Sequence, residues 1–300
     1  MLSSTEMRQK IKAGQGFIAA LDQSGGSTPK ALAGYGVADD AYSSDEDMFA
    51  LIHQMRSRIM TSPCFNGDKV IGAILFERTM DGDVDGKPVP ALLQERGVVP
   101  FIKIDKGLED EAQGVQLMKP MPDLDALLAR ARGLGVFGTK ERSVINRADL
   151  AGIAAIVAQQ FAVAKQVIRG GLMPIIEPEV NIKSAERAQC DVLLRDSILT
   201  ALDGLAEGEE LMLKLSIPAE AGLFQPLVDH PRVLRVVALS GGFSRTEACQ
   251  QLARNPGMIA SFSRALLSDL RHGMDDGEFD RSLGGAIAEI YGASTTKVPA

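Results

Sequence analysis

Residues 211–218 read LMLKLSIP, an apolar run of strand length that holds one charged residue, Lys214. Short apolar runs separated by helical patterns are typical of buried parallel strands. Seven similar runs occur elsewhere in the chain, with helical patterns between them. Strands that alternate with helices in this number predict an α/β fold, a (β/α)8 TIM barrel, rather than an open sheet. The expected strands lie near residues 17–22, 70–77, 99–105, 136–140, 172–179, 211–217, 233–240 and 258–263.

Helical periodicity fills the segments between these runs. Residues 45–60, after a Ser44 cap, and residues 148–169 each place apolar side chains on one helical face. Ser3 and Glu6 predict a capped surface helix at the N-terminus. Further helices are expected near residues 123–133, 183–204, 244–254, 264–271 and 276–291.

The turn after the first expected strand opposes a dinucleotide-binding sheet. It reads DQSGGS over residues 22–27 and lacks the G-x-G-x-x-G pattern. No linker, low-complexity tract or internal repeat divides the chain. Residues 1–300 are therefore expected to form a single barrel domain with an N-terminal helix and a short C-terminal tail.

Composition excludes several classes of function. The net charge is -7, from Lys+Arg 32 against Asp+Glu 39, which opposes a nucleic-acid partner. A local cluster of lysines can still attract an anionic substrate. No run approaches the ~18 apolar residues that span a membrane. Three scattered cysteines oppose a disulfide framework and favour a cytoplasmic location. The three histidines are not spaced as a pair of metal ligands, so the sequence offers few residues for a histidine-based metal site.

The segment 79–97 contains a partial calcium motif. Asp81-x-Asp83-x-Asp85-Gly86 matches the start of an EF-hand loop, but Leu92 stands where the bidentate glutamate should be. Turn signals and two prolines flank the motif. A solvated turn or small hairpin is the favoured interpretation.

Polar residues stand where the apolar runs stop. The carboxyl ends of parallel strands are where chemistry gathers in barrels and in doubly wound sheets. Burying a charge in the interior of a strand costs free energy, so this pattern predicts that the polar side chains meet at one shared mouth of the barrel. The residues concerned are Asp22, Lys103, Asp105, Lys140, Glu177, Glu179, Lys214 and Ser240.

Lys214 is the first candidate for catalysis. Leucines flank it on both sides, so it should point into the barrel from a buried strand. Burial and nearby cations such as Lys103 and Lys140 disfavour a charged lysine, and a neutral lysine amine attacks ketones to form a Schiff base. An inward lysine paired with a carboxylate as part of barrel packing is an equally good interpretation.

Three carboxylates accompany it. Glu177 and Glu179 flank Pro178, and strand alternation sends both to one side. Either can move protons, or pair with Lys140 or Lys214. Asp22 is suited to act as a base on a substrate hydroxyl, although it can also cap the helix that follows.

Small residues and cations mark two candidate anion sites. Ser240-Gly241-Gly242 follows the seventh strand, and Ser263-Arg264 follows the eighth, the usual phosphate position in a barrel. Small residues let backbone N–H groups approach an anion, but Ser-Gly-Gly is also an ordinary turn. Across the mouth, Ser24 and Ser27 with Lys103 suggest a second site. Two phosphate sites on either side of a lysine nucleophile imply a bisphosphorylated carbonyl substrate.

These motifs resemble one family. DQSGGS (22–27), FIKIDKG (101–107), Lys140-x-Arg142, PIIEPE (174–179), LMLKLSIP, LSGGFS (239–244) and SFSRAL (261–266) are similar, in this order, to class I fructose-1,6-bisphosphate aldolases of the short bacterial form. The resemblance covers residues 15–265. It implies a barrel enzyme that cleaves fructose 1,6-bisphosphate to dihydroxyacetone phosphate and glyceraldehyde 3-phosphate, with no metal and no organic cofactor.

The resemblance also implies roles for individual residues. Lys214 corresponds to the Schiff-base lysine, and Glu177 to the acid and base of carbinolamine chemistry. Asp22 corresponds to the carboxylate that deprotonates the C4 hydroxyl, and Lys140 orients it with support from Arg142 and Glu179. The 1-phosphate site corresponds to Ser240, Gly241 and Arg264, and the 6-phosphate site to Ser24, Ser27 and Lys103.

The sequence departs from the animal-type pattern at three places. The chain ends soon after Tyr291, so the terminal tyrosine that helps to protonate the enamine has no clear counterpart. Tyr291 is better interpreted as the end of an amphipathic helix. SFSRAL is shorter than the animal-type stretch, and Gln23 replaces an acidic residue and has no assigned role.

Two other functions are compatible with the residues. One is another Schiff-base lyase or transferase, such as a transaldolase-like enzyme acting on monophosphorylated sugars. The other is a barrel retained for binding or scaffolding, which the intact polar site opposes. A homo-oligomer is possible, and no motif indicates the number of subunits.

Overall fold

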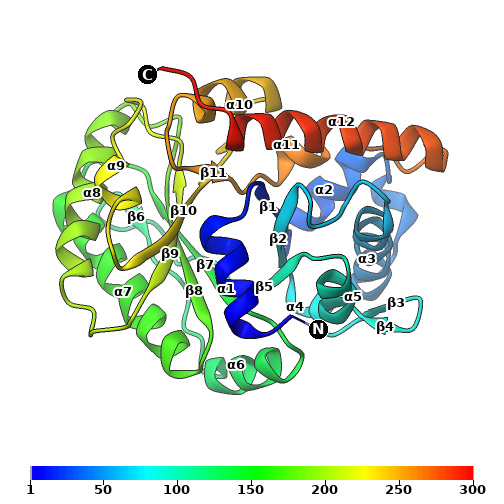
Figure 1. Ribbon diagram of the computed structural model, residues 1–300, viewed down its shortest axis with the longest axis horizontal. Coiled ribbons are helices and arrows are strands. Elements are labelled where there is room, and N and C mark those ends of the chain that lie inside the picture. The colour runs from blue at the N-terminus through cyan, green and yellow to red at the C-terminus, as the bar shows by residue number, and fades with distance from the viewer. Residues whose placement is uncertain (1, 300) are drawn as a thin grey trace.

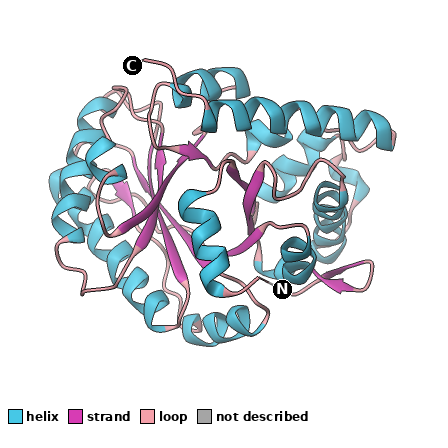
Figure 2. Ribbon diagram, viewed as in Figure 1, coloured by secondary structure: helices cyan, strands magenta, loops and turns pink. Residues whose placement is uncertain are grey.

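Parallel strands form a barrel in which the last strand returns to the first. The computed structural model describes residues 2–299. Ala20 donates its backbone N–H to the Phe262 carbonyl oxygen at 3.2 Å, which joins the segment after the final strand to β1. The strands, in spatial order, are β1 (Phe17–Leu21), β2 (Val70–Leu75), β5 (Val99–Lys103), β7 (Gly138–Ile145), β8 (Met173–Val180), β9 (Leu211–Ser216), β10 (Val233–Leu239) and β11 (Ile259–Ala260). The predicted barrel is confirmed (Figure 2).

Two strands differ from their expected bounds by more than two residues at one end, and the other six differ by one or two residues. Strand β7 continues to Ile145 because it pairs with β8 along its whole length, and β6 (Val115–Gln116) pairs with its far end. Arg142 therefore lies inside a strand and not in a following loop. Strand β11 is short, with only Ile259 and Ala260 paired to β10.

Helix α1 (Ser4–Ala13) closes the N-terminal end of the barrel. Its capping box is present, with the Glu6 N–H donating to Ser3 Oγ at 3.3 Å. Met7 and Ile11 pack with the apolar side chains inside the barrel, such as Ile18 and Phe101. Figure 1 shows α1, in dark blue, lying across the strands. Because one end is closed by apolar contacts, a ligand has access from the other.

The remaining helices surround the strands (Figure 1). Helix α7 (Leu150–Arg169) is long and apolar enough to cross a membrane by length and composition, but its buried face packs against β8 and against α8 (Arg187–Leu202) in the outer layer. Residues 83–88 form the small hairpin β3 (Asp83–Val84) and β4 (Lys87–Pro88). The helices are α2 (Ser27–Tyr35), α3 (Asp45–Thr61), α4 (Glu77–Met80), α5 (Val89–Glu95), α6 (Leu124–Gly133), α7 (Leu150–Arg169), α8 (Arg187–Leu202), α9 (Gln225–Val228), α10 (Arg245–Ala253), α11 (Arg264–Leu267) and α12 (Asp276–Thr295), with a 3-10 turn at Asp39–Ala41.

The C-terminal segment is fixed at the N-terminal end of the barrel. Lys297 Nζ donates to the carbonyl oxygens of Leu252 at 3.2 Å, Met258 at 2.6 Å and Ala293 at 2.8 Å. The Tyr291 ring centroid lies 5.9 Å from Nζ of Lys69, the residue that precedes β2. Tyr291 therefore belongs to the end of α12 and lies far from the C-terminal ends of the strands.

Candidate active site

One cavity of about 750 Å³ opens at the C-terminal ends of the strands. Its walls come from the ends of β1, β5, β7, β8, β9 and β10 and from the segment after β11. All thirteen site residues expected from the sequence line it: Asp22, Ser24, Ser27, Lys103, Lys140, Arg142, Glu177, Glu179, Lys214, Ser240, Gly241, Ser263 and Arg264. The prediction of one shared mouth agrees with this arrangement.

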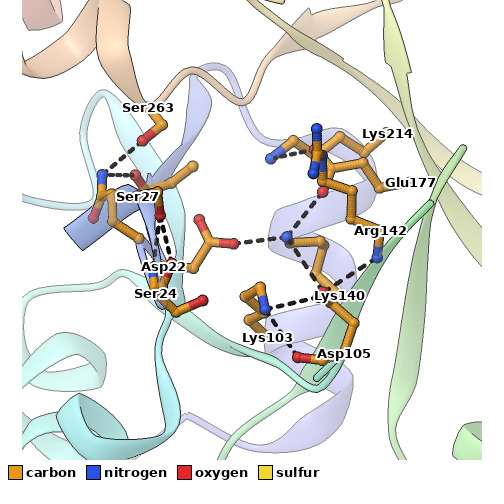
Figure 3. A network of polar contacts seen from close by, with 12 residues as sticks. Asp22, Ser24, Ser27, Lys103, Asp105, Lys140, Arg142, Glu177, Lys214 and Ser263 are labelled. Atoms are coloured by element: carbon orange, nitrogen blue, oxygen red, sulfur yellow. Dashed lines mark hydrogen bonds and ion pairs between the residues drawn. The ribbon is translucent and has the colours of Figure 1, made fainter. Parts of the chain in front are cut away.

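A chain of four charged side chains crosses the floor of the cavity (Figure 3). Lys140 Nζ lies 2.7 Å from Asp22 Oδ2 and 2.9 Å from Glu177 Oε2. Lys214 Nζ lies 3.0 Å from the other oxygen of the same carboxylate, Glu177 Oε1. All four residues are buried. Two carboxylates thus alternate with two amines at buried positions.

Strand alternation produces this convergence. Lys140 and Arg142 face the cavity from β7, while Glu141 between them is fully buried and does not line it. Burial raises the pKa of Glu141 well above its usual range, which favours the neutral form of this side chain. The registers of β7 and β8 place Arg142 opposite Glu177, and Pro178 does not interrupt the pairing. Glu177 and Glu179 therefore reach the same cavity, as expected.

Opposite charges keep the carboxylates ionised. Burial alone would raise the pKa of Asp22, but the charges of Lys140 and Lys214 outweigh it and hold that pKa far below its usual value. The same two lysines, acting against burial, lower the pKa of Glu177. Burial disfavours charge on Lys140 too, but Asp22 and Glu177 raise its pKa above the ordinary value. Asp22 is accordingly a carboxylate, and Lys140 an ammonium, at neutral pH.

Two further ion pairs border this chain. Lys103 Nζ lies 2.7 Å from Asp105 Oδ1, and Arg142 Nε lies 2.5 Å from Glu179 Oε2. Asp105 also accepts a hydrogen bond from the Arg142 backbone N–H at 3.2 Å. The Asp105 carboxylate therefore neutralises part of the positive charge that Lys103 presents to the cavity.

The loops after β10 and β11 form the first candidate anion site. Gly241 and Gly242 have φ values of +61° and +119°, conformations that glycine adopts readily. A Cβ on Gly242 would lie 3.5 Å from Arg264 Nη2, so the guanidinium borders this turn. Ser240 and Ser263 complete the wall. Small residues and one exposed cation are therefore brought together here, as the sequence predicts.

The turn after β1 lies beside this first site, because Gln23 Nε2 donates to Ser263 Oγ at 2.6 Å, and Figure 3 shows Ser24 and Ser27 on the same side as Ser263. The expectation that the second site lies across the mouth was therefore wrong. The Ser24 backbone N–H donates to Ser27 Oγ at 2.9 Å, and Ser27 Oγ donates to the Ser24 carbonyl oxygen at 2.8 Å. Lys30 follows on α2, lines the cavity and is exposed. Sequence reasoning missed Lys30, although its spacing of three residues from Ser27 places both on one helical face.

A family model described as fructose-bisphosphate aldolase class-I matches residues 4–206. The chain belongs to the class I fructose-bisphosphate aldolase family. The match includes Asp22, Lys140 and Glu177 and ends before Lys214. The resemblance drawn from the motifs is therefore confirmed.

Solved aldolase structures share the fold of this family member. Fructose-bisphosphate aldolase from Plasmodium falciparum, solved in complex with TRAP and a small-molecule inhibitor, is 20% identical, with a TM-score of 0.78 over 98% of this chain and 95% of that chain. An archaeal fructose-1,6-bisphosphate aldolase, whose catalytic lysine carries the carbinolamine intermediate of the substrate, is 13% identical, with a TM-score of 0.53 over 97% of this chain and 100% of that chain. At these identities the likeness concerns the barrel fold.

The aldolase cavity contains no arrangement typical of a metal centre. Within residues 2–299, no group of three or more His, Cys, Asp or Glu side chains is placed to hold a metal ion.

Tyr291 does not line the cavity. Besides Lys30, the walls include Gln23, Tyr35, Asp105 and Ser261, to which the sequence assigned no role.

Proposed function

We propose that this class I aldolase reversibly cleaves fructose 1,6-bisphosphate to dihydroxyacetone phosphate and glyceraldehyde 3-phosphate through a Schiff base on Lys214. The observation that carries this proposal is the Lys214–Glu177–Lys140–Asp22 chain on the floor of a cavity whose walls contain two candidate anion sites. It supplies a nucleophile, a proton shuttle and a base in the order in which the reaction needs them.

Formation of the Schiff base requires a neutral lysine amine. Glu177 Oε1, 3.0 Å from Lys214 Nζ, can accept the proton that the ammonium loses. The amine then attacks C2 of the substrate, and Glu177 returns this proton to the C2 oxygen. Glu177 next removes a second proton from the attached nitrogen, which gives the carbinolamine, and donates it to the C2 hydroxyl, which leaves as water. The product is an iminium ion between C2 and Lys214.

Cleavage of the C3–C4 bond requires a base and an electron acceptor. Asp22, held ionised by Lys140 at 2.7 Å, removes the proton from the C4 hydroxyl. The C3–C4 electron pair moves toward the iminium carbon, which gives an enamine on Lys214 and releases glyceraldehyde 3-phosphate. Lys140 remains charged throughout and stabilises the negative charge that develops nearby.

The two phosphates would lie at neighbouring parts of the mouth, one at the loops after β10 and β11 and the other at the turn after β1. The turn at Ser240 and Gly241 with Arg264 suits the 1-phosphate, since its backbone and its guanidinium can surround an anion. Ser24 and Ser27 suit the 6-phosphate. We assign the charge at this second site chiefly to Lys30, because Lys103 is paired with Asp105.

A direct comparison of substrates tests the proposal. Purified protein should release equal amounts of dihydroxyacetone phosphate and glyceraldehyde 3-phosphate from fructose 1,6-bisphosphate. A transaldolase-like enzyme would instead transfer a dihydroxyacetone group from fructose 6-phosphate to an acceptor aldehyde. Preferred turnover of the monophosphate, or no turnover of either sugar, would contradict the proposal.

A further inference from the structure

A fully buried arginine stands behind the mouth of the barrel without a carboxylate partner. Arg56 lies on α3, has 0% exposed surface, and makes no ion pair within the described part of the chain. Burial lowers the pKa of Arg56 to about 10, with the charge of Asp22 acting in the opposite direction, so the group is charged at neutral pH. Burying a cation without a carboxylate partner costs desolvation free energy, which the hydrogen bonds of Arg56 must offset.

Those contacts lead to the cavity through Gln23. Arg56 Nη2 donates to the Gln23 carbonyl oxygen at 2.5 Å and to Gln23 Oε1 at 3.2 Å, and Arg56 Nη1 donates to Thr79 Oγ1 at 2.7 Å. Gln23 Nε2 then donates to Ser263 Oγ at 2.6 Å and to the Ala20 carbonyl oxygen at 3.3 Å. Gln23 and Ser263 both line the cavity. The turn after β1 is thus connected to the loop after β11.

The chemistry of these groups determines which atom donates and which accepts in each of these hydrogen bonds. A guanidinium group can only donate hydrogen bonds, so Gln23 Oε1 must face it as the acceptor. The amide nitrogen of Gln23 then faces Ser263 as a donor, and Ser263 Oγ accepts. The Ser263 hydroxyl hydrogen is therefore free to be donated to a group in the cavity, which Ser263 lines together with the next residue, Arg264.

We propose that Gln23, held by Arg56, is a positioning residue that directs the Ser263 hydroxyl hydrogen toward the 1-phosphate of the substrate. The inference rests on the proposed function, because it concerns one phosphate site of the same cavity. Gln23, which stands where animal-type members have an acidic residue, thereby acquires a role. A glutamate at this position would accept from Ser263 and turn the hydroxyl hydrogen away from the phosphate.

The test combines substitutions at two positions with a matched control. Gln23→Glu and Ser263→Ala should each raise KM for fructose 1,6-bisphosphate about tenfold, the effect of one lost charge-assisted hydrogen bond. The value of kcat should stay within about threefold, because binding lost equally from ground and transition states leaves kcat unchanged. Gln54→Glu, on the exposed face of α3, adds the same charge and should leave both constants unchanged.

The double variant separates positioning from a direct effect of charge. If Gln23 acts through Ser263, Gln23→Glu should raise KM less than about twofold further in a Ser263→Ala background. A full tenfold rise in that background would assign the effect to charge and overturn the proposal, as would an unchanged KM in Gln23→Glu alone. Thermal unfolding of each variant identifies any loss of fold.

Inorganic phosphate gives a readout that does not depend on turnover. Its dissociation constant, measured by calorimetry, should rise in Gln23→Glu and in Ser263→Ala and stay at the wild-type value in Gln54→Glu. If wild-type protein fails to cleave fructose 1,6-bisphosphate, the proposed function fails, and this measurement still decides the role of Gln23. Equal phosphate affinity in wild type and Gln23→Glu would refute the positioning role.

Discussion

Replacement of Lys140 by methionine removes the cation shared by two buried carboxylates. Lys140 Nζ lies 2.7 Å from Asp22 and 2.9 Å from Glu177, and its side chain is 3% exposed. Coulomb attraction is about 6 kcal/mol for each contact at an effective dielectric constant of about 20. Much of this is offset by desolvation, and the loss of one partner from a buried ion pair costs about 3–5 kcal/mol. We expect a folded but destabilised variant.

The same change should alter the pH dependence of catalysis. In the wild type Lys140 and Lys214 hold the pKa of Asp22 low against burial, so the base is ionised through the neutral range. In Lys140→Met only Lys214 and Lys103 remain to oppose the effect of burial, so the pKa of Asp22 rises and a smaller fraction of the base is ionised at neutral pH. We expect kcat to fall by about 100-fold or more at pH 7, a loss of general-base catalysis, and to increase with rising pH.

A coupled assay of fructose 1,6-bisphosphate cleavage between pH 5 and pH 10 measures this change, and thermal unfolding measures stability. Lys12→Met, which removes an exposed lysine of α1, is the matched control and should behave as wild type. A Lys140→Met variant with kcat within about threefold of wild type and the same pH profile would refute the electrostatic role of Lys140.

Three further outcomes are expected. Ser24→Ala with Ser27→Ala should raise KM for fructose 1,6-bisphosphate about tenfold or more while KM for fructose 1-phosphate stays nearly unchanged; equal effects on both would remove these serines from the 6-phosphate site. Burial raises the pKa of Asp191 from 3.8 to about 6, so its ionisation opposes folding by about 3 kcal/mol above pH 6. Asp191→Asn should therefore increase the unfolding free energy at pH 8 and show no gain below about pH 4, and equal stability at pH 8 would contradict this. Activity should survive EDTA, and its loss would indicate a metal-dependent reaction.

Sequence patterns were sufficient to predict the barrel and the residues of its mouth. Each strand is an apolar run, and the end of a run is visible as the first charge, as at Asp22 and Lys103. Because parallel strands end on one side, convergence follows from topology without knowledge of side-chain contacts. The helix after Asp22, α2, was expected but given no bounds, because Pro29 and Gly34 within it are typical of a loop.

Contacts between distant elements could not be predicted from local patterns. The helical periodicity that places Met55 and Ile59 in the core does not reveal that Arg56 is buried beside them. The partner of Lys103 is Asp105, two residues later, yet only the folded strand end shows that this pair reduces the charge available to a phosphate. The position of Tyr291 likewise depends on which end of the barrel receives the end of α12.

Reductive trapping tests the central claim most directly. Wild-type protein incubated with dihydroxyacetone phosphate and reduced with borohydride should lose activity irreversibly and gain one covalent adduct, which peptide mass spectrometry should place on Lys214. Lys140→Met, which keeps Lys214, should still form the adduct more slowly. An adduct on another lysine, or full activity after reduction with substrate present, would contradict a Schiff base at Lys214.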